Sequence, residues 1–198
     1  MTNPKTNRSE KREKHMTTVN GVNVDRIVST VNAIKAEPDL ARFRFRSTTE
    51  WVKGGHSRTH IKGFYGAGEE DISRNTAFTL ESDEPSVLAG SNLGPNAVEA
   101  ILYALASCLA VGFAYNAAIQ GIQIETLDFT LEGEIDLHGF LGLSEQVRPG
   151  YQHIHVFYRL KSDAPREKLL ELCEYVQRTS PVLDVIRNPV PVTVTLQG

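Results

Sequence analysis

The sequence predicts a single α+β domain, because three kinds of pattern follow one another along the chain. Residues 41–81 alternate apolar and polar side chains in short runs, which is typical of half-buried strands. Residues 97–120 are apolar on nearly every face, which is typical of a buried helix. Further strand patterns and two shorter helical patterns follow. This order indicates an α+β arrangement rather than repeated βαβ units.

The segment before the long apolar run contains one helical pattern and three strand patterns. Residues 22–36 repeat apolar side chains at helical spacing, and Pro38 ends this pattern. The next three patterns alternate with period two, and we expect strands at residues 41–51, 56–65 and 75–81. Gly54 and Gly55 indicate a turn, so the first two strands are expected to form a hairpin.

The segment after the long helix contains both element types. Gly121 is expected to end that helix, because glycine commonly follows a helix C-terminus. Helices are expected at residues 165–178, with Pro165 in the first turn, and at 181–187. Residues 137–148 are expected to form a loop. Strands are expected at residues 124–135, 151–160 and 190–196.

The composition is that of an ordinary globular chain. With 198 residues, 40% of them hydrophobic, the chain can bury one core without a disulfide or metal staple. Its net charge of −3 gives no electrostatic reason to expect nucleic acid or a membrane as partner, and the basic N-terminus lacks the apolar segment of an export signal. We therefore expect a cytoplasmic protein. Its expected parts are a disordered basic tail at 1–19, an N-terminal helical extension at 20–39 and the main domain at 40–198.

The two cysteines, Cys108 and Cys173, are the candidates for chemistry. Two cysteines cannot make a disulfide scaffold or an all-cysteine zinc site, so a redox or nucleophilic function is the alternative to packing. Cys108 lies in the middle of the long helix. It is either a small buried hydrophobic residue or a reactive thiolate, and a reactive thiolate requires a cation nearby.

Two histidine pairs alternate along expected strands, and we interpret them as ordinary strand residues. Two histidines alone do not specify a metal, and no glycine-rich phosphate loop is present. No metal and no cofactor are therefore expected. The pairs are His56 with His60 and His153 with His155.

Two motifs resemble those of the OsmC/Ohr family. Residues 94–99 (Gly-Pro-Asn-Ala-Val-Glu) and 102–108 (Leu-Tyr-Ala-Leu-Ala-Ser-Cys) are similar to its central cysteine helix. Residues 180–182 and 188–192 resemble its second-cysteine motif and its final strand. The likeness covers roughly residues 41–198. It implies an OsmC-like fold in which antiparallel sheets wrap central buried helices in an intertwined homodimer.

The resemblance also implies an activity. Peroxidase members of the family reduce organic hydroperoxides with a reactive cysteine, which maps to Cys108. The arginine that stabilises the thiolate maps to Arg58, with Arg46 as second choice, and the glutamate that orients this arginine maps to Glu99. No cofactor takes part.

Two positions depart from the family pattern. Ser180 stands where the peroxidase members have a resolving cysteine, and Cys173 is either a displaced resolving cysteine or a packed helix residue. The usual glutamate position, ten residues before the cysteine, is Val98. Glu99 is nine residues before Cys108, on the opposite helix face, where it also suits the helix dipole.

Two hypotheses of different class follow. In the first, the chain is a one-cysteine thiol peroxidase of oxidative-stress defence, which acts on an organic hydroperoxide through Cys108 and is recycled by an external thiol reductant. In the second, it is a non-catalytic OsmC-like dimer that binds a small apolar ligand or a partner. Both require a homodimer with a large apolar interface, because short strands cannot cover a helix that is apolar all round.

Overall fold

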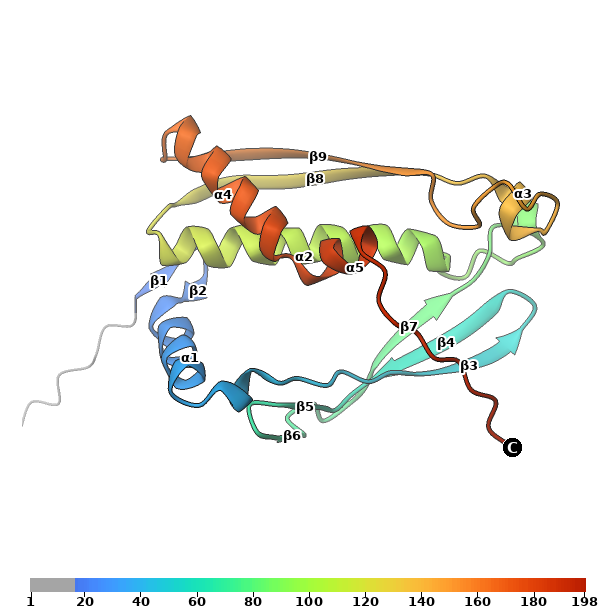
Figure 1. Ribbon diagram of the computed structural model, residues 1–198, viewed down its shortest axis with the longest axis horizontal. Helices are drawn as coiled ribbons and strands as arrows, with labels where there is room; N and C mark the ends of the chain where they lie inside the picture. Colours follow the sequence, from blue (N-terminus) through green and yellow to red (C-terminus); the bar gives the residue numbers. More distant parts are fainter. Residues whose placement is uncertain (1–16) are drawn as a thin grey trace, which may run out of the picture.

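The long apolar run folds as α2 (Ala97–Ile119), and the other elements are arranged around this helix (Figure 1). The computed structural model describes residues 17–198, so most of the expected basic tail lies outside the described residues. Asn96 and Glu99 form a capping box at the start of α2. Gly121, with φ +72°, follows its last turn, as predicted.

One side of α2 packs against a two-stranded antiparallel sheet and two helices. The sheet consists of β8 (Ile124–Glu134) and β9 (His153–Ser162), and the helices are α4 (Arg166–Thr179) and α5 (Pro181–Arg187). Each confirms a predicted element to within a few residues. The buried core between them consists of Leu105, Leu109, Phe113, Ala117, Ile122, Leu172, Cys173, Val176 and Leu183.

A second sheet lies on the other side of α2. Its three antiparallel strands are β3 (Thr48–Lys53), β4 (His56–Ile61) and β7 (Phe78–Ser82), in the order β3-β4-β7. The predicted hairpin is confirmed, and Gly54 takes φ +55° in its turn. The strand predicted at 41–51 is wrong in extent, since residues 42–47 make only one isolated bridge, between Arg44 and Tyr65.

The strand predicted at 56–65 is split in two. After β4 the chain turns and continues as β5 (Phe64–Gly66), which pairs with β6 (Glu69–Asp71) instead of with the larger sheet. Phe64 explains part of this change of direction. Its ring packs against those of Phe43 and Phe45, with centroids 6.2 and 5.4 Å away, so the aromatic side chains form their own small cluster.

The N-terminal segment is tied to the main domain. A hairpin of β1 (Thr18–Val19) and β2 (Val22–Asn23) precedes α1 (Val24–Ala36), and a 3-10 turn, η1 (Pro38–Ala41), follows it. Asn20 at the hairpin turn donates to the carbonyl of Ile122 over 2.9 Å and accepts from the N–H of Ile124 over 2.8 Å. The first described residues therefore join the beginning of β8.

Two short helices lie in connections. They are η2 (Ser86–Leu88), before α2, and α3 (Leu137–Phe140), in the connection between β8 and β9 that was predicted as a loop.

The strand predicted at residues 190–196 is wrong for the single chain. These residues pair with no described strand, and the side chains of Val192, Val194 and Leu196 are 77, 93 and 97% exposed. An alternating apolar pattern gives a strand only where a sheet edge is available to pair with it.

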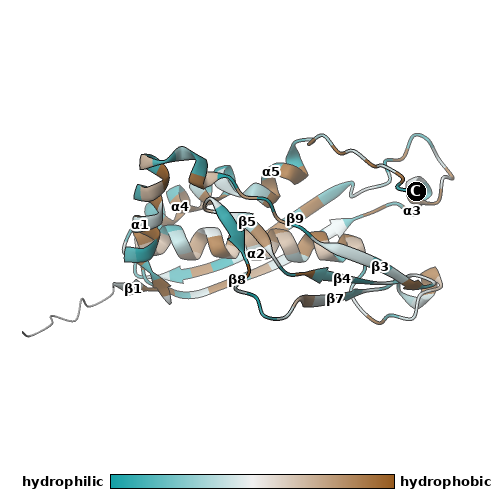
Figure 2. Cartoon of the chain, turned by 90° about the horizontal axis from the view of Figure 1, so that it is seen from below, coloured by the Kyte–Doolittle hydropathy of each residue, from teal (hydrophilic) through white to brown (hydrophobic). Residues whose placement is uncertain are grey.

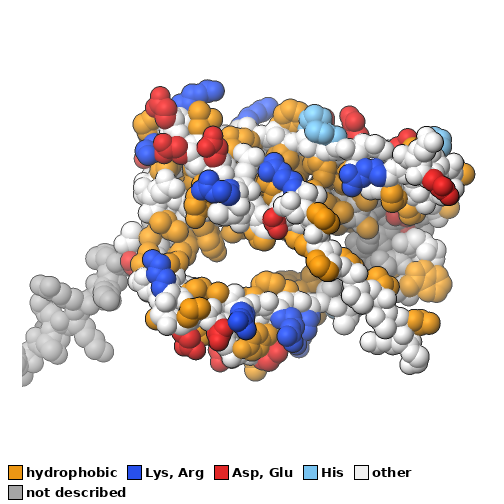
Figure 3. Space-filling view, viewed as in Figure 1, with side chains coloured by type: hydrophobic (Ala, Val, Ile, Leu, Met, Phe, Trp, Pro, Cys, Tyr) orange, Lys and Arg blue, Asp and Glu red, His pale blue; other side chains and the backbone are white. Residues whose placement is uncertain are grey.

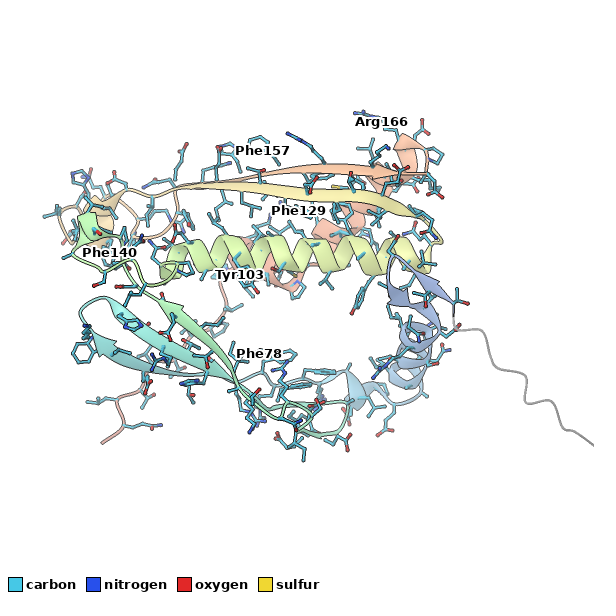
Figure 4. The ribbon with its side chains drawn as sticks, turned by 180° about the vertical axis from the view of Figure 1, so that it is seen from behind. Phe78, Tyr103, Phe129, Phe140, Phe157 and Arg166 are labelled. Atoms are coloured by element: carbon cyan, nitrogen blue, oxygen red, sulfur yellow. The ribbon has the colours of Figure 1, made fainter. Side chains whose placement is uncertain are left out.

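One face of α2 is uncovered in the single chain, so burial of the whole helix, which the sequence predicts for a homodimer, stays a prediction. Side chains at four-residue spacing form an exposed stripe along α2, consisting of Tyr103, Ser107, Val111, Tyr115 and Ile119. This stripe faces an open space, whose far side is formed by residues 42–47 and β5 and, toward the N-terminal end of α2, by the three-stranded sheet (Figures 1 and 3). Tyr103 extends into this space from α2, and Phe78 extends into it from β7 (Figure 4).

Apolar residues occur along the whole of α2 (Figure 2), which by length and composition alone could span a membrane. Residues of its inner face, including Leu105, Leu109 and Phe113, belong instead to the core that α2 shares with β8, β9, α4 and α5. This packing is that of a core helix with one side uncovered.

Candidate functional site

Cys108 is placed by α2 on the side of the helix that faces α5. It directly precedes Leu109 of the buried core and is itself half-buried. Its Sγ lies 3.1 Å from Ser180 Oγ. The structure therefore brings the predicted reactive cysteine into direct contact with Ser180, at the position where the peroxidase members have a resolving cysteine, although 72 residues separate them.

Ser180 is positioned by the junction of α4 and α5. It is the C-cap residue of α4 and the N-cap residue of α5, and its Oγ accepts a hydrogen bond from Leu183 N–H over 3.2 Å. The sequence favours this geometry, because serine is a good N-cap residue and Pro181 suits the first position of a helix. Ser180 is only 5% exposed, so its hydroxyl group is largely shielded from solvent.

Cys173 is a core residue of α4. It is 7% exposed and packs with the apolar residues between α2 and the β8–β9 sheet. Gln177 Nε2 donates to its Sγ over 3.3 Å. Burial and a hydrogen bond to Cys173 raise the pKa of Tyr158 to about 12. Both cysteines are free thiols, and the surroundings of Cys173 are those of a packed helix residue.

Arg58 lies on β4, in the middle of the three-stranded sheet. Its Nε donates to Glu81 Oε1 over 2.7 Å, and one of its terminal nitrogens donates to Glu50 over 3.4 Å. His56 Nε2 lies 2.7 Å from the other oxygen of Glu81. Hydrogen bonds from Arg58 and then from His56 hold the pKa of Glu81 below its ordinary value.

The structure does not bring Arg58, Glu99 and Cys108 together within one chain. The hydrogen-bond partners of Arg58 among the described residues are Glu50 and Glu81. Glu99 accepts from Asn96 N–H over 2.8 Å, as the capping residue of α2. Arg46, the second choice, is paired with Glu70. The roles predicted for Arg58 and Glu99 at the sulfur therefore stay predictions.

Sequence reasoning missed the residues that hold Arg58. Glu50 and Glu81 are the direct cross-strand neighbours of Arg58 on β3 and β7. Opposite charges at facing positions of neighbouring strands attract, so an arginine on one strand with a glutamate on each adjacent strand was a signal that the sequence contained. The register that aligns these residues depends on where each strand begins, and alternation alone does not fix it.

Sequence reasoning also missed Asp83, which holds the loop that precedes α2. Asp83 is 2% exposed and accepts hydrogen bonds from the backbone N–H groups of Glu84, Ser91 and Leu93, over 2.8, 3.0 and 3.3 Å. Burial alone would raise the pKa of Asp83, but these hydrogen bonds lower it below its ordinary value. Asp83 thus fixes the loop that leads from β7 to the cysteine helix.

The histidine pairs lie on strands, as expected. His153 and His155 alternate along the outer face of β9, with ring centroids 4.0 Å apart. Among residues 17–198, no group of three or more histidine, cysteine or acidic side chains is arranged to hold a metal ion.

A large cavity lies on the core side of α2, and Cys173 is among its lining residues, whereas Cys108 and Ser180 are not. It has a volume of about 970 Å³ and lies between α2, β9 and the two C-terminal helices. Most of its walls are apolar, and Arg148 and Arg187 are among its lining residues. Leu109 and Leu183 line it as well; Leu109 directly follows Cys108, and the N–H of Leu183 is bonded to Ser180 Oγ.

The fold and the site together define a class of protein: an α+β protein whose central helix carries a half-buried thiol in contact with the last helix, α5. Residues 90–195, just over half of the chain, match the family model of OsmC-like proteins. The chain belongs to this family. The match includes both Cys108 and Ser180.

Solved structures confirm the mixed α+β fold. An OsmC-like protein from Mycoplasma pneumoniae has a TM-score of 0.55 at 14% identity, over 74% of this chain and 89% of that one. An organic hydroperoxide resistance protein, OsmC, from Legionella pneumophila has a TM-score of 0.50 at 14% identity, over 72% of this chain and 88% of that one. No curated protein sequence matches the chain significantly. One of these solved structures is therefore that of a hydroperoxide resistance protein, and identities this low show the fold alone.

Proposed function

We propose that the chain is a thiol-dependent peroxidase that reduces organic hydroperoxides through Cys108. The observation that carries the proposal is the difference between its two cysteines. Cys108 is half-buried and contacts the residue at the family's resolving position, whereas Cys173 is 7% exposed and belongs to the core, where it lines the cavity. A reactive cysteine must be partly exposed, because peroxide has to reach its sulfur.

The chemistry requires a thiolate and two external reactants. The Cys108 thiolate attacks the terminal oxygen of the hydroperoxide, so that an S–O bond forms and the O–O bond breaks. The hydroperoxide is reduced to an alcohol, which takes up one proton, and Cys108 is oxidised to sulfenic acid. The cavity on the core side of α2, which is lined by Leu109 next to Cys108 and has mostly apolar walls, suits the hydrocarbon part of such a substrate.

An external thiol completes the cycle, because Ser180 cannot form a disulfide. One thiol molecule condenses with the sulfenic acid, releases water and leaves a mixed disulfide on Cys108. A second molecule attacks the sulfur of the bound thiol, which frees Cys108 as the thiolate and releases a small disulfide. Such recycling needs a reducing compartment, which favours the cytoplasm.

We further propose that the working form is a homodimer. The exposed stripe of α2 and Phe78 of the three-stranded sheet line one open space, and an uncovered apolar surface of this kind favours association. A second copy that fills this space would bury at least about 2,000 Å² in total. It would also offer the unpaired segment at 190–196 a sheet edge. Arg58 and Cys108 lie in different layers of one chain, so a contact between them belongs to this assembled dimer.

The test of the function compares the two cysteines. Purified Cys108→Ser and Cys173→Ser proteins are given tert-butyl hydroperoxide and dithiothreitol, and peroxide consumption is followed. We expect Cys108→Ser to abolish catalysed consumption and Cys173→Ser to keep most of it. Catalysis that survives in the Cys108→Ser protein would contradict the proposal.

The cavity supports a second function, the binding of a small apolar ligand without catalysis. Its volume of about 970 Å³ is large enough for a ligand of drug size. Native mass spectrometry of the purified protein distinguishes the two functions. A bound apolar molecule, together with peroxide consumption no faster than in the Cys108→Ser protein, would favour this second function.

A further inference from the structure

Ser180 is placed to act on the sulfur of Cys108. It is 5% exposed, and its Oγ lies 3.1 Å from Cys108 Sγ. The same oxygen accepts the N–H of Leu183 over 3.2 Å, as the N-cap of α5. The hydroxyl group of Ser180 therefore has two hydrogen-bond partners. The N–H of Leu183 donates to it, and between it and Cys108 Sγ either group can be the donor.

The ionisation state of Cys108 decides the direction of the shared hydrogen bond. A thiolate has no proton and can only accept, so next to a thiolate Ser180 must donate its hydroxyl hydrogen. The N–H of Leu183 occupies a lone pair of the oxygen, which leaves the hydrogen free to point at the sulfur. A hydrogen bond donated to the charged form of a group favours that form.

We propose that Ser180 is a catalytic residue, which stabilises the Cys108 thiolate by donating a hydrogen bond to it; this inference rests on the peroxidase function proposed above. Within the described chain, Arg58 is held by Glu50 and Glu81, and the hydroxyl of Ser180 is the polar side-chain group that contacts the sulfur. The residue at the resolving position thus activates the thiol instead of resolving it.

The test uses three substitutions of Ser180 in a full chain that also carries Cys173→Ser, so that Cys108 is the only thiol. Ser180→Ala removes both the hydroxyl group and the N-cap of α5. Ser180→Gly removes the hydroxyl group, but glycine is a much better N-cap residue than alanine. Ser180→Thr keeps both. The rate of alkylation by iodoacetamide is measured across a range of pH for each protein.

We expect the alanine and glycine variants to behave alike. The pH midpoint of alkylation should rise by about one unit in both, which is about tenfold less thiolate at a fixed pH below the midpoint. Ser180→Thr should keep the original midpoint. An unchanged midpoint in the glycine variant, or a shift in the alanine variant alone, would overturn the inference, because the latter would reflect the loss of the cap.

Peroxide consumption by the same proteins supplies the second readout. Ser180→Gly should slow it about tenfold at neutral pH, and the rate should recover at alkaline pH, where the thiolate forms without help. Alkylation needs no peroxide, so the two proposals fail separately. A shifted midpoint in a protein whose consumption does not depend on Cys108 would support the hydrogen bond and refute the peroxidase function.

Discussion

Arg58 and Glu81 face each other across the β4–β7 pair, and Arg58 Nε donates to Glu81 Oε1 over 2.7 Å. Glu50 reaches the guanidinium group from the other neighbouring strand, and His56 contacts the far oxygen of Glu81. Exposed ion pairs contribute little to stability, so the main consequence of this arrangement is geometric. It fixes the direction in which the sheet presents its central arginine.

Arg58→Ala should slow peroxide consumption at least about tenfold if this arginine stabilises the thiolate in the dimer, because a nearby cation increases the thiolate fraction. Arg46→Ala is the matched control, since Arg46 is also paired with a glutamate, Glu70. It should change the rate less than about twofold, within the range expected for a surface ion pair. Initial rates with tert-butyl hydroperoxide decide between them, and equal effects of the two substitutions would refute the role of Arg58.

The dimer should depend on the exposed stripe of α2. Val111 is 51% exposed in the middle of this stripe, so Val111→Glu would place a charge in an apolar interface. We expect this protein to sediment as a monomer at micromolar concentration. Thr130→Glu, on the outer face of β8, is the control and should leave the dimer intact. An unmodified protein that is already a monomer would contradict the dimer itself.

Acid should destabilise the protein mainly through the buried Asp83, with a smaller contribution from the more exposed Glu81. The ordinary pKa values of these groups are 4.5 and 3.8, and both are lowered in the fold. A carboxylate with a lowered pKa stabilises the fold above its ordinary pKa, and this contribution is lost as the pH falls through the lowered value. The urea midpoint should therefore fall as the pH drops below about 4.5. Glu81→Gln should flatten this dependence, and a slope identical to that of the unmodified protein would exclude Glu81 as a cause.

The sequence was sufficient where the structure is local. Gly54 indicates the hairpin turn because the turn needs a positive φ. The apolar run at 97–120 indicates the helix α2 because it is much longer than an ordinary β-strand. Ser180 and Pro181 likewise mark the start of α5.

The rest depends on partners that are distant in the chain. Residues 190–196 have a strand pattern but pair with no strand of the described chain. Glu81 meets Arg58 only through the register of β4 and β7. The contact of Cys108 with Ser180 depends on how α5 packs on α2, and spacing along the sequence says nothing about that packing.

Cys173→Ser should lower stability without affecting the reaction. The substitution puts a hydroxyl group where Cys173 packs with the apolar core, with Gln177 as its one side-chain donor in the same helix. We expect a loss of about 1–2 kcal/mol in the free energy of unfolding, measured with urea. At urea concentrations below those that unfold the protein, the rate of peroxide consumption should stay within about twofold of that of the unmodified protein. A twofold change in rate corresponds to a change of less than about 0.5 kcal/mol in the activation free energy. A large loss of activity at unchanged stability would indicate that Cys173 takes part in the cycle.

The fate of the oxidised thiol should change with one substitution at Ser180. In the unmodified protein we expect one equivalent of hydroperoxide to give a Cys108 sulfenic acid that dimedone traps, and excess to give the sulfinic acid, because no thiol contacts the sulfur.

Ser180→Cys should instead give a disulfide between Cys108 and the introduced thiol. The Oγ of Ser180 already lies 3.1 Å from Cys108 Sγ, so a small side-chain movement brings two sulfurs to the bonding distance of about 2.05 Å. Thr179→Cys is the matched control, because the side chain of Thr179 is exposed and bonded to Tyr175 O, and it should still give the sulfenic acid. Intact-mass and peptide mass spectrometry identify each product. A dominant Cys108–Cys173 disulfide in the unmodified protein would show that the resolving cysteine has moved to α4, and that recycling begins inside the chain.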